Sequence, residues 1–270
     1  MDGQGIHKTP IGSARKDEVI TETLNFIFGG EPHDERVFWD EVWRHRIKSG
    51  EFTELTNWFQ KKLYEKRISE VLLPLYGDFH GKKVLEAGCG SGYAGLLLAK
   101  LGATTSFLDF STSALEYSKE LGRKISVPEK RVIYTRGDIR QLPFPSESFD
   151  LIYNSGVLEH YGDQEIIFIL QEFKRVLKKG GGVFAVIPNL LSMEMLRRMK
   201  NFGKGSEHYI SRKHFLALFK RAGLERVEIG SAHASALPSS LSLKIYERVA
   251  FLEKHLRRLD YLFYARGVKN

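Results

Sequence analysis

The sequence is poor in cysteine and has no long apolar run. Its 270 residues include one cysteine, Cys89, which excludes an internal disulfide and a zinc or iron–sulfur cluster built on thiolates. No segment approaches the ~18 consecutive apolar residues of a membrane-spanning helix. Residues 1–20 lack the apolar core of a signal peptide. We therefore expect a cytoplasmic protein, with no metal site.

Negative charge is scarce in the last third of the chain. The formal net charge is +8, and Asn189 to Asn270 contain 16 Lys and Arg against 7 Asp and Glu. The rest of the chain is close to neutral. An acidic partner would therefore meet the C-terminal third.

Hydrophobic patterning divides the chain into regions. Residues 1–35 are weakly patterned and predict a loose N-terminal segment, while residues 36–80 have apolar positions at helical spacing and predict a helical cap. Residues 81–270 alternate short apolar strands with longer helices, with helical insertions at about 190–222 and 238–260. This alternation predicts an α/β fold, a mostly parallel sheet with helices on both faces.

The predicted elements have defined positions. Strands are expected at 82–87, 104–109, 131–138, 149–155, 181–188, 224–232 and 261–269, and helices at 93–102, 111–124 and 164–180. Gly102 and Gly180 are expected to end the first and last of these helices, because glycine commonly closes a helix.

A glycine-rich turn follows the first predicted strand, in the stretch VLEAGCGSG. Gly88, Gly90 and Gly92 depart from the dinucleotide pattern G-x-G-x-x-G, since Tyr93 occupies the place after Gly92. A helix N-terminus at such a turn usually favours an anion. Glu86 would repel a phosphate, so the turn predicts a ligand that carries positive charge.

Two further acids lie at the ends of the next two predicted strands. Asp109 is placed where a carboxylate can accept both hydroxyls of a ribose, and Asp138 where it could accept a hydrogen bond from an exocyclic amine. The alternative for Asp109 is a helix N-cap, a role that Ser111 or Thr112 could also fill. Three acids at successive strand ends predict a cationic nucleoside ligand.

These motifs resemble class I S-adenosylmethionine-dependent methyltransferases of the small-molecule, type 11-like branch. The resemblance rests on VLEAGCGSG, the acid that closes the second strand, GD followed by LPFPSESFDLI, and LEH. It is close over 81–189 and looser at GLERVEIGS and YARGVK. It implies a Rossmann-like sheet of seven strands with an antiparallel edge, and S-adenosyl-L-methionine as cofactor.

The resemblance also implies a role for residues along the cofactor. Glu86 and the backbone of Gly88 and Gly90 would hold the methionine end, with its ammonium and sulfonium. Towards the nucleoside, the implied residues are Asp109 at the ribose, Phe110 beside the adenine, Asp138 and Ile139 at the adenine edge and face, and Asn154 near the sulfonium.

Candidates on the acceptor side are fewer. His160 in LEH is the candidate general base, although it could equally brace a loop. Trp39 lies four residues before Trp43 on one helical face, and we interpret the pair either as core or, for Trp39, as part of a lid over the cofactor. His208 and Tyr209 could face the acceptor, or form a polar turn before a helix capped by Ser211.

The acceptor itself is predicted as a small metabolite methylated on oxygen or nitrogen. A predicted helix at about 240–260 has an apolar stripe flanked by basic residues, which indicates packing within the chain, a homodimer, or a peripheral membrane contact. The alternatives are a lipid or isoprenoid acceptor, RNA, or a catalytically inert cofactor-binding protein. Nucleic acid is disfavoured because no RNA-binding module is recognised.

Overall fold

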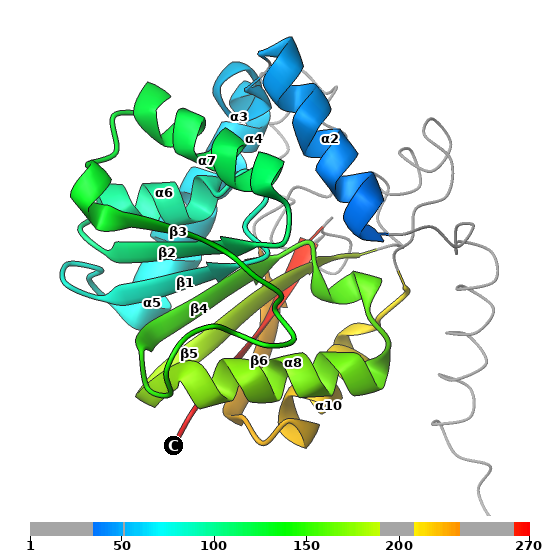
Figure 1. The fold of residues 1–270 in the computed structure, drawn as a ribbon. Helices are drawn as coiled ribbons and strands as arrows, with labels where there is room; N and C mark the ends of the chain where they lie inside the picture. Colours follow the sequence, from blue (N-terminus) through cyan, green and yellow to red (C-terminus); the bar gives the residue numbers. More distant parts are fainter. Residues whose placement is uncertain (1–34, 51, 190–207, 233–261) are drawn as a thin grey trace, which may run out of the picture.

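A seven-stranded sheet forms the centre of the computed structural model, which describes residues 35–50, 52–189, 208–232 and 262–270 (Figure 1). The strand order is β3-β2-β1-β4-β5-β7-β6. The strands are β1 (Lys83–Ala87), β2 (Thr104–Asp109), β3 (Val132–Arg136), β4 (Phe149–Ser155), β5 (Leu177–Pro188), β6 (Glu225–Ser231) and β7 (Leu262–Val268). β7 runs antiparallel to its neighbours β5 and β6, and β1 to β5 are parallel. The predicted fold class is therefore confirmed.

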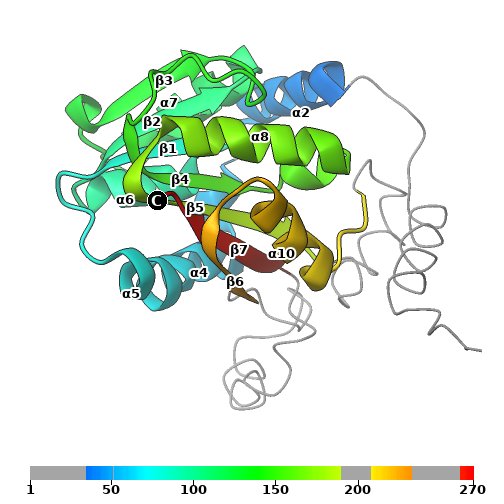
Figure 2. The ribbon, with the colours of Figure 1, turned by 90° about the horizontal axis from the view of Figure 1, so that it is seen from below.

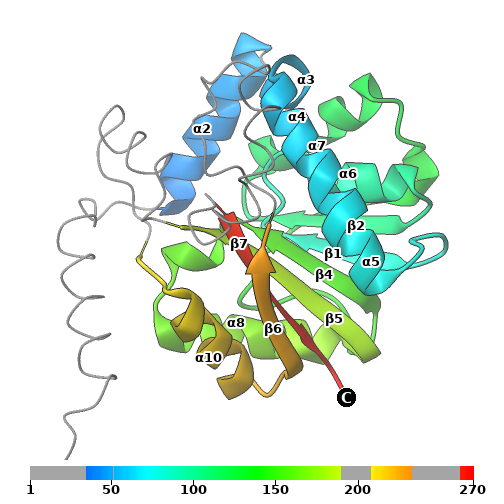
Figure 3. The ribbon, with the colours of Figure 1, turned by 180° about the vertical axis from the view of Figure 1, so that it is seen from behind.

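Helices cover both faces of the sheet. The helices are α2 (Glu35–Ser49), α3 (Thr53–Thr56), α4 (Trp58–Lys66), the π-helix η1 (Arg67–Leu72), α5 (Leu73–Tyr76), α6 (Tyr93–Lys100), α7 (Thr112–Lys124), α8 (Asp163–Val176) and α10 (Arg212–Arg221), with 3-10 turns η2 (Glu129–Arg131) and η3 (Leu158–His160). One face packs on α8 and α10 (Figure 2). The opposite face packs on η1, α5, α6 and α7 (Figure 3).

Two helix ends follow local rules that the sequence carries. Ser111 caps α7, where its Oγ accepts a hydrogen bond from Ala114 N at 3.1 Å, and Ser211 caps α10 in the same way. Gly102 follows the end of α6 with a φ of +97°, a conformation that glycine adopts without steric cost. These caps are as the sequence predicts.

The prediction that Gly180 ends the last core helix is wrong. The helix α8 ends at Val176, and β5 begins at the next residue, so Gly180 lies within the strand. Its N–H donates to the carbonyl of Lys269 at 2.8 Å, after the end of β7. This long-range pairing extends the strand into a segment that looks helical in sequence.

The helix α2 contacts the segments that follow β1, β2, β3 and β4, at the carboxyl edge of the sheet (Figure 1). Residues 1–34, 190–207 and 233–261, which include the predicted loose segment and the predicted helix at 240–260, lie outside the described residues. Within the described ranges no helix has the length and apolarity to span a membrane.

Candidate functional site

The glycine turn lies between β1 and α6, at the centre of the carboxyl edge. Gly88, Gly90 and Gly92 all have positive φ, at +67°, +51° and +67°. A Cβ at Gly90 would lie 2.7 Å from Cζ2 of Trp43, because α2 packs directly over the turn. Glycine is therefore needed at Gly90 for its conformation and for the close approach of Trp43.

Glu86 points from the end of β1 into the interior beneath this turn. Its side chain is 5% exposed, and its Oε2 accepts the N–H of Gly95, in the first turn of α6, at 2.7 Å. Burial raises the pKa of Glu86 to about 8, against the Gly95 hydrogen bond and the positive charge of Arg67, which lower it. A cation bound at the turn would favour the ionised carboxylate.

Asp109 closes β2 and braces the same turn. Its Oδ2 accepts from Gly90 N at 2.9 Å and its Oδ1 from Ser111 N at 3.0 Å. Burial raises its pKa although these hydrogen bonds oppose the rise. Since Ser111 is the cap of α7, Asp109 does not serve as the N-cap.

Asn154, near the end of β4, presents an acceptor atom at this edge. The side chain is fully buried, and its Nδ2 donates to the carbonyl of Ala87 at 2.7 Å, next to the turn. Its Oδ1 is buried without a hydrogen-bond partner in the described part of the chain. A buried acceptor of this kind is costly unless a donor satisfies it.

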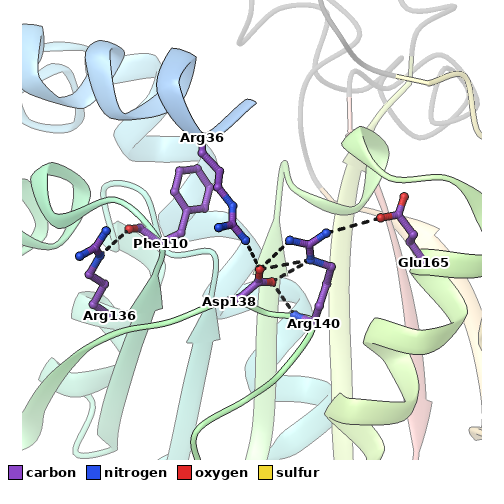
Figure 4. A network of polar contacts seen from close by, with 6 residues as sticks. All are labelled: Arg36, Phe110, Arg136, Asp138, Arg140 and Glu165. Atoms are coloured by element: carbon purple, nitrogen blue, oxygen red, sulfur yellow. Dashed lines mark hydrogen bonds and ion pairs between the residues drawn. The ribbon is translucent and has the colours of Figure 1, made fainter. Parts of the chain in front are cut away.

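Asp138, after β3, is held by two arginines (Figure 4). Both carboxylate oxygens accept from Arg140, at 2.8–3.2 Å, and Arg36 from α2 forms a further ion pair with Oδ2. Partial burial raises its pKa, but the hydrogen bonds and charges of Arg140 and Arg36 outweigh burial and lower it. Ile139, beside it, is buried at 5% exposure.

A hollow of about 780 Å³ lies between α2 and the loops that follow β2 and β3. Its lining includes Phe110, Ser111 and Asp138 from the sheet edge, and Arg36 and Asp40 from α2. Asp40 also fastens α2 to the site, because its Oδ1 accepts from Ser111 Oγ at 2.7 Å. The hollow thus adjoins two of the three predicted cofactor acids, Asp109 through its neighbours and Asp138 directly.

The acceptor-side candidates lie near η3. The rings of Trp39 and His160 meet edge to face, with centroids 5.6 Å apart. His208 is exposed, and its N–H donates to the carbonyl of Glu159 at 2.7 Å, while Tyr209 is half-buried. The structure therefore brings Trp39, His160 and the segment of His208 to one region, beside the turn that Trp43 covers.

Several residues of the site were missed by sequence reasoning. Asp40 and Arg36 sit on a helix that the sequence shows only as an apolar pattern, and Gly95 appears as an ordinary helical residue. A signal for Gly95 was available, since an interior glycine lowers helix stability and indicates a close contact. There a Cβ would collide with Glu86 Oε2 and lie 2.7 Å from the ring of Phe107.

The site fits the cofactor predicted from the sequence. Glu86 and the unsatisfied Oδ1 of Asn154 supply buried acceptors beside the turn, which suits an ammonium or sulfonium and disfavours a phosphate. Residues 84–181 match the family described as "Methyltransferase domain".

Comparison with known proteins agrees with this fit. A 27-O-demethylrifamycin SV methyltransferase from Amycolatopsis mediterranei is 24% identical over 192 residues, 69% of each chain. A demethylmenaquinone methyltransferase from Staphylococcus aureus is 28% identical over 56% of this chain and 65% of its own. Three of the curated relatives, the rifamycin methyltransferase among them, are matched over 69%, 54% and 40% of their own length.

Solved structures agree on the fold. A Thermotoga maritima protein described as a S-adenosylmethionine-dependent methyltransferase, "possible histamine N-methyltransferase", superposes with a TM-score of 0.61 at 18% identity. The match covers 86% of this chain and 100% of that one. The fold is that of the Rossmann-like methyltransferases. Residues 84–181 form a methyltransferase domain, similar to those of S-adenosylmethionine-dependent methyltransferases.

Proposed function

We propose that this enzyme transfers the methyl group of S-adenosyl-L-methionine to an oxygen or nitrogen of a small metabolite. The observation that carries the proposal is the presence of two buried acceptors next to the glycine turn: the carboxylate of Glu86, and the amide oxygen of Asn154, which has no partner among the described residues. The names of the rifamycin and menaquinone relatives support a metabolite acceptor. We also propose that the chain is divided into a loose segment (1–35), a helical cap (36–80) and a methyltransferase domain (81–270).

The cofactor would be held along the carboxyl edge. Glu86, Asn154 and the backbone of Gly88 and Gly90 would take the methionine end, and Asp109 the ribose. The adenine would lie with Phe110, Asp138 and Ile139. When bound, the cofactor supplies an electrophilic methyl group on a sulfonium.

The chain's own contribution is alignment and exclusion of water. Methyl transfer from a sulfonium removes charge, so a dry site that aligns the reacting atoms accelerates it. The contacts of Trp43 with the turn and of Trp39 with His160 make α2 a cover for the site. His160 would accept the proton of a hydroxyl or amine acceptor where that proton must leave.

Calorimetric titration with S-adenosyl-L-methionine tests the cofactor site. We expect Glu86→Gln and Asp109→Ala each to weaken binding by about 1–3 kcal/mol, because each removes a charge-assisted interaction. Asp150→Asn is the matched control, since Asp150 pairs with Lys178 at the opposite edge of the sheet. Unchanged affinity in both site variants would refute the assignment of the pocket.

The acceptor class is tested separately. Transfer of a tritiated methyl group to lysate fractions of metabolites, lipids, RNA and protein should label the metabolites. Label confined to RNA or to lipid would replace the proposed acceptor class. Cofactor binding with no label in any fraction would favour an inert binding protein.

A further inference from the structure

Arg67 is a buried cation on the face of the sheet that carries Glu86. It begins the π-helix η1, and its side chain is 2% exposed. Its Nη1 donates to the hydroxyl of Tyr153 at 2.6 Å, and its Nε to the carbonyl of Ala232 at 3.3 Å. Its guanidinium also lies 5.1 Å from the centre of the Tyr64 ring. These partners are all uncharged.

A buried guanidinium held by uncharged groups is costly unless a negative charge lies near it. Among the described residues, no carboxylate is within ion-pair distance of Arg67. Tyr153 is the register partner of Glu86 on the neighbouring parallel strand, so the two side chains emerge side by side on one face. Tyr153 therefore holds the buried cation on the face of the sheet that carries the buried carboxylate.

The groups that surround Glu86 can be named element by element. Arg67 from η1 is the cation, Tyr153 from β4 and Tyr64 from α4 contribute neutral phenols, and Asp109 from β2 contributes a second carboxylate. The N–H of Gly95, in α6, donates to the carboxylate. Cys89 in the turn and Tyr134 from β3 complete the set of titratable neighbours. Arg67 is the one cation in this described set.

We propose that Arg67 is a positioning residue that acts through Glu86: its buried charge, fixed by Tyr153, favours the ionised form of Glu86, which the cofactor's positive end requires. The proposal rests on the proposed role of Glu86 in holding the cofactor. Asp109 and the apolar surroundings favour the protonated acid, and Arg67 opposes both. The cofactor thus meets a carboxyl that ionises more readily than burial alone would allow.

The test compares Arg67→Met with Arg67→Lys. Affinity for S-adenosyl-L-methionine is measured by calorimetry from about pH 6 to about pH 8.5, where ionisation of Glu86 should strengthen binding as pH rises. Loss of the cation should move this rise upward by about one pH unit and weaken binding near neutral pH about tenfold. Arg67→Lys keeps the charge and should restore the profile. Arg175→Met, at a half-exposed ion pair with Glu172 on α8, is the matched control and should leave it unchanged.

A second measurement does not use the cofactor. The pH dependence of unfolding is compared between the parent and Glu86→Gln, and again in the Arg67→Met background, so that each difference isolates the titration of Glu86. We expect the pH midpoint of the Glu86 titration in the folded protein to be higher when Arg67 is absent. If Arg67→Met does not fold, Tyr153→Phe, which removes the hydroxyl that fixes the guanidinium, should show a smaller shift in the same direction.

The outcomes separate the two proposals. An unchanged midpoint, with cofactor affinity that still depends on Glu86, would overturn the role of Arg67 alone. Cofactor affinity that is indifferent to Glu86→Gln would overturn the proposed function, and with it the positioning role. A shift in both Arg67→Met and Arg67→Lys would show that packing, and not charge, was responsible.

Discussion

Two carboxylates at the same edge of the sheet are held in opposite ways. Glu86, near the end of β1, is buried with one backbone hydrogen bond, and burial raises its pKa to about 8. Asp138, after β3, is partly exposed, and the hydrogen bonds and charges of Arg140 and Arg36 lower its pKa in spite of partial burial. Position at a strand end therefore does not determine the charge state of an acid.

The difference has a physical meaning for the site. At the edge of the sheet, arginines can reach Asp138 from solvent without a large desolvation cost. Beside the central strand β1, additional cations would occupy the place of the ligand. Glu86 is therefore kept in surroundings of low polarity. The central acid is therefore available to a cationic ligand, while the peripheral acid is already engaged in joining α2 to the loop.

The largest expected effect is the pH dependence that Glu86 imposes on stability. A carboxyl whose pKa is higher in the folded than in the unfolded state makes unfolding easier as pH rises between the two values. The parent should lose stability between about pH 4.5 and about pH 8 relative to Glu86→Gln, by on the order of 4 kcal/mol. Urea unfolding across this range measures the difference. Parallel curves would show that burial does not control Glu86.

Gly95→Ala should disturb the packing around Glu86 without changing any charge. The new Cβ would collide with Glu86 Oε2 and with the Phe107 ring. We expect a loss of about 1–3 kcal/mol from overpacking, which outweighs the gain of up to about 1 kcal/mol in helix propensity. Thermal unfolding measures the loss. Gly122→Ala is the control in α7, where the nearest atom is a flexible end of Leu96 at 3.0 Å; equal effects would contradict the explanation.

Asp138→Asn should show the opposite pH dependence. Because the folded pKa of Asp138 is lowered, its contribution is present above the ordinary value of 3.8 and is lost as pH falls below it. The variant should be less stable than the parent by about 1 kcal/mol or less at neutral pH, and equal to it in strong acid. A difference that grew in acid would reverse this assignment.

The smallest effect concerns the two ion pairs of α2. Arg36 joins the helix to Asp138, whereas Arg44 pairs with Asp40 within the helix. Each replacement by Gln should cost about 0.2–1 kcal/mol. Only Arg36→Gln should increase hydrogen exchange in the first turns of α2 relative to the sheet. Equal exchange in both variants would mean that the Arg36 contact does not fasten the helix.

Much of the fold could be predicted because local pattern determines it. The strands 104–109 and 149–155 have the predicted bounds, since each is a mostly buried stretch, the first ending at Asp109 and the second followed by Gly156. The wrong end of α8 has a non-local cause. Gly180 pairs with Lys269, 89 residues away, and no pattern within the segment reveals that contact.

The candidate site also has features that local sequence predicts and features that depend on long-range contacts. The turn and its acids could be predicted from spacing, because strand ends of a parallel sheet share one edge. The contacts of those acids could not. Arg67 and Tyr153 are 86 residues apart in sequence and meet only because η1 packs on the sheet. Arg36 reaches Asp138 across 102 residues for a similar reason.

The single cysteine offers a practical handle on the turn. Cys89 is 6% exposed between Gly88 and Gly90, and burial raises the pKa of its thiol, so the folded protein presents almost no thiolate. Since the chain has no other sulfhydryl group, a thiol-specific reagent would react at this position alone. The rate at which the reagent is incorporated would therefore report how often the glycine turn opens, with no further cysteine introduced.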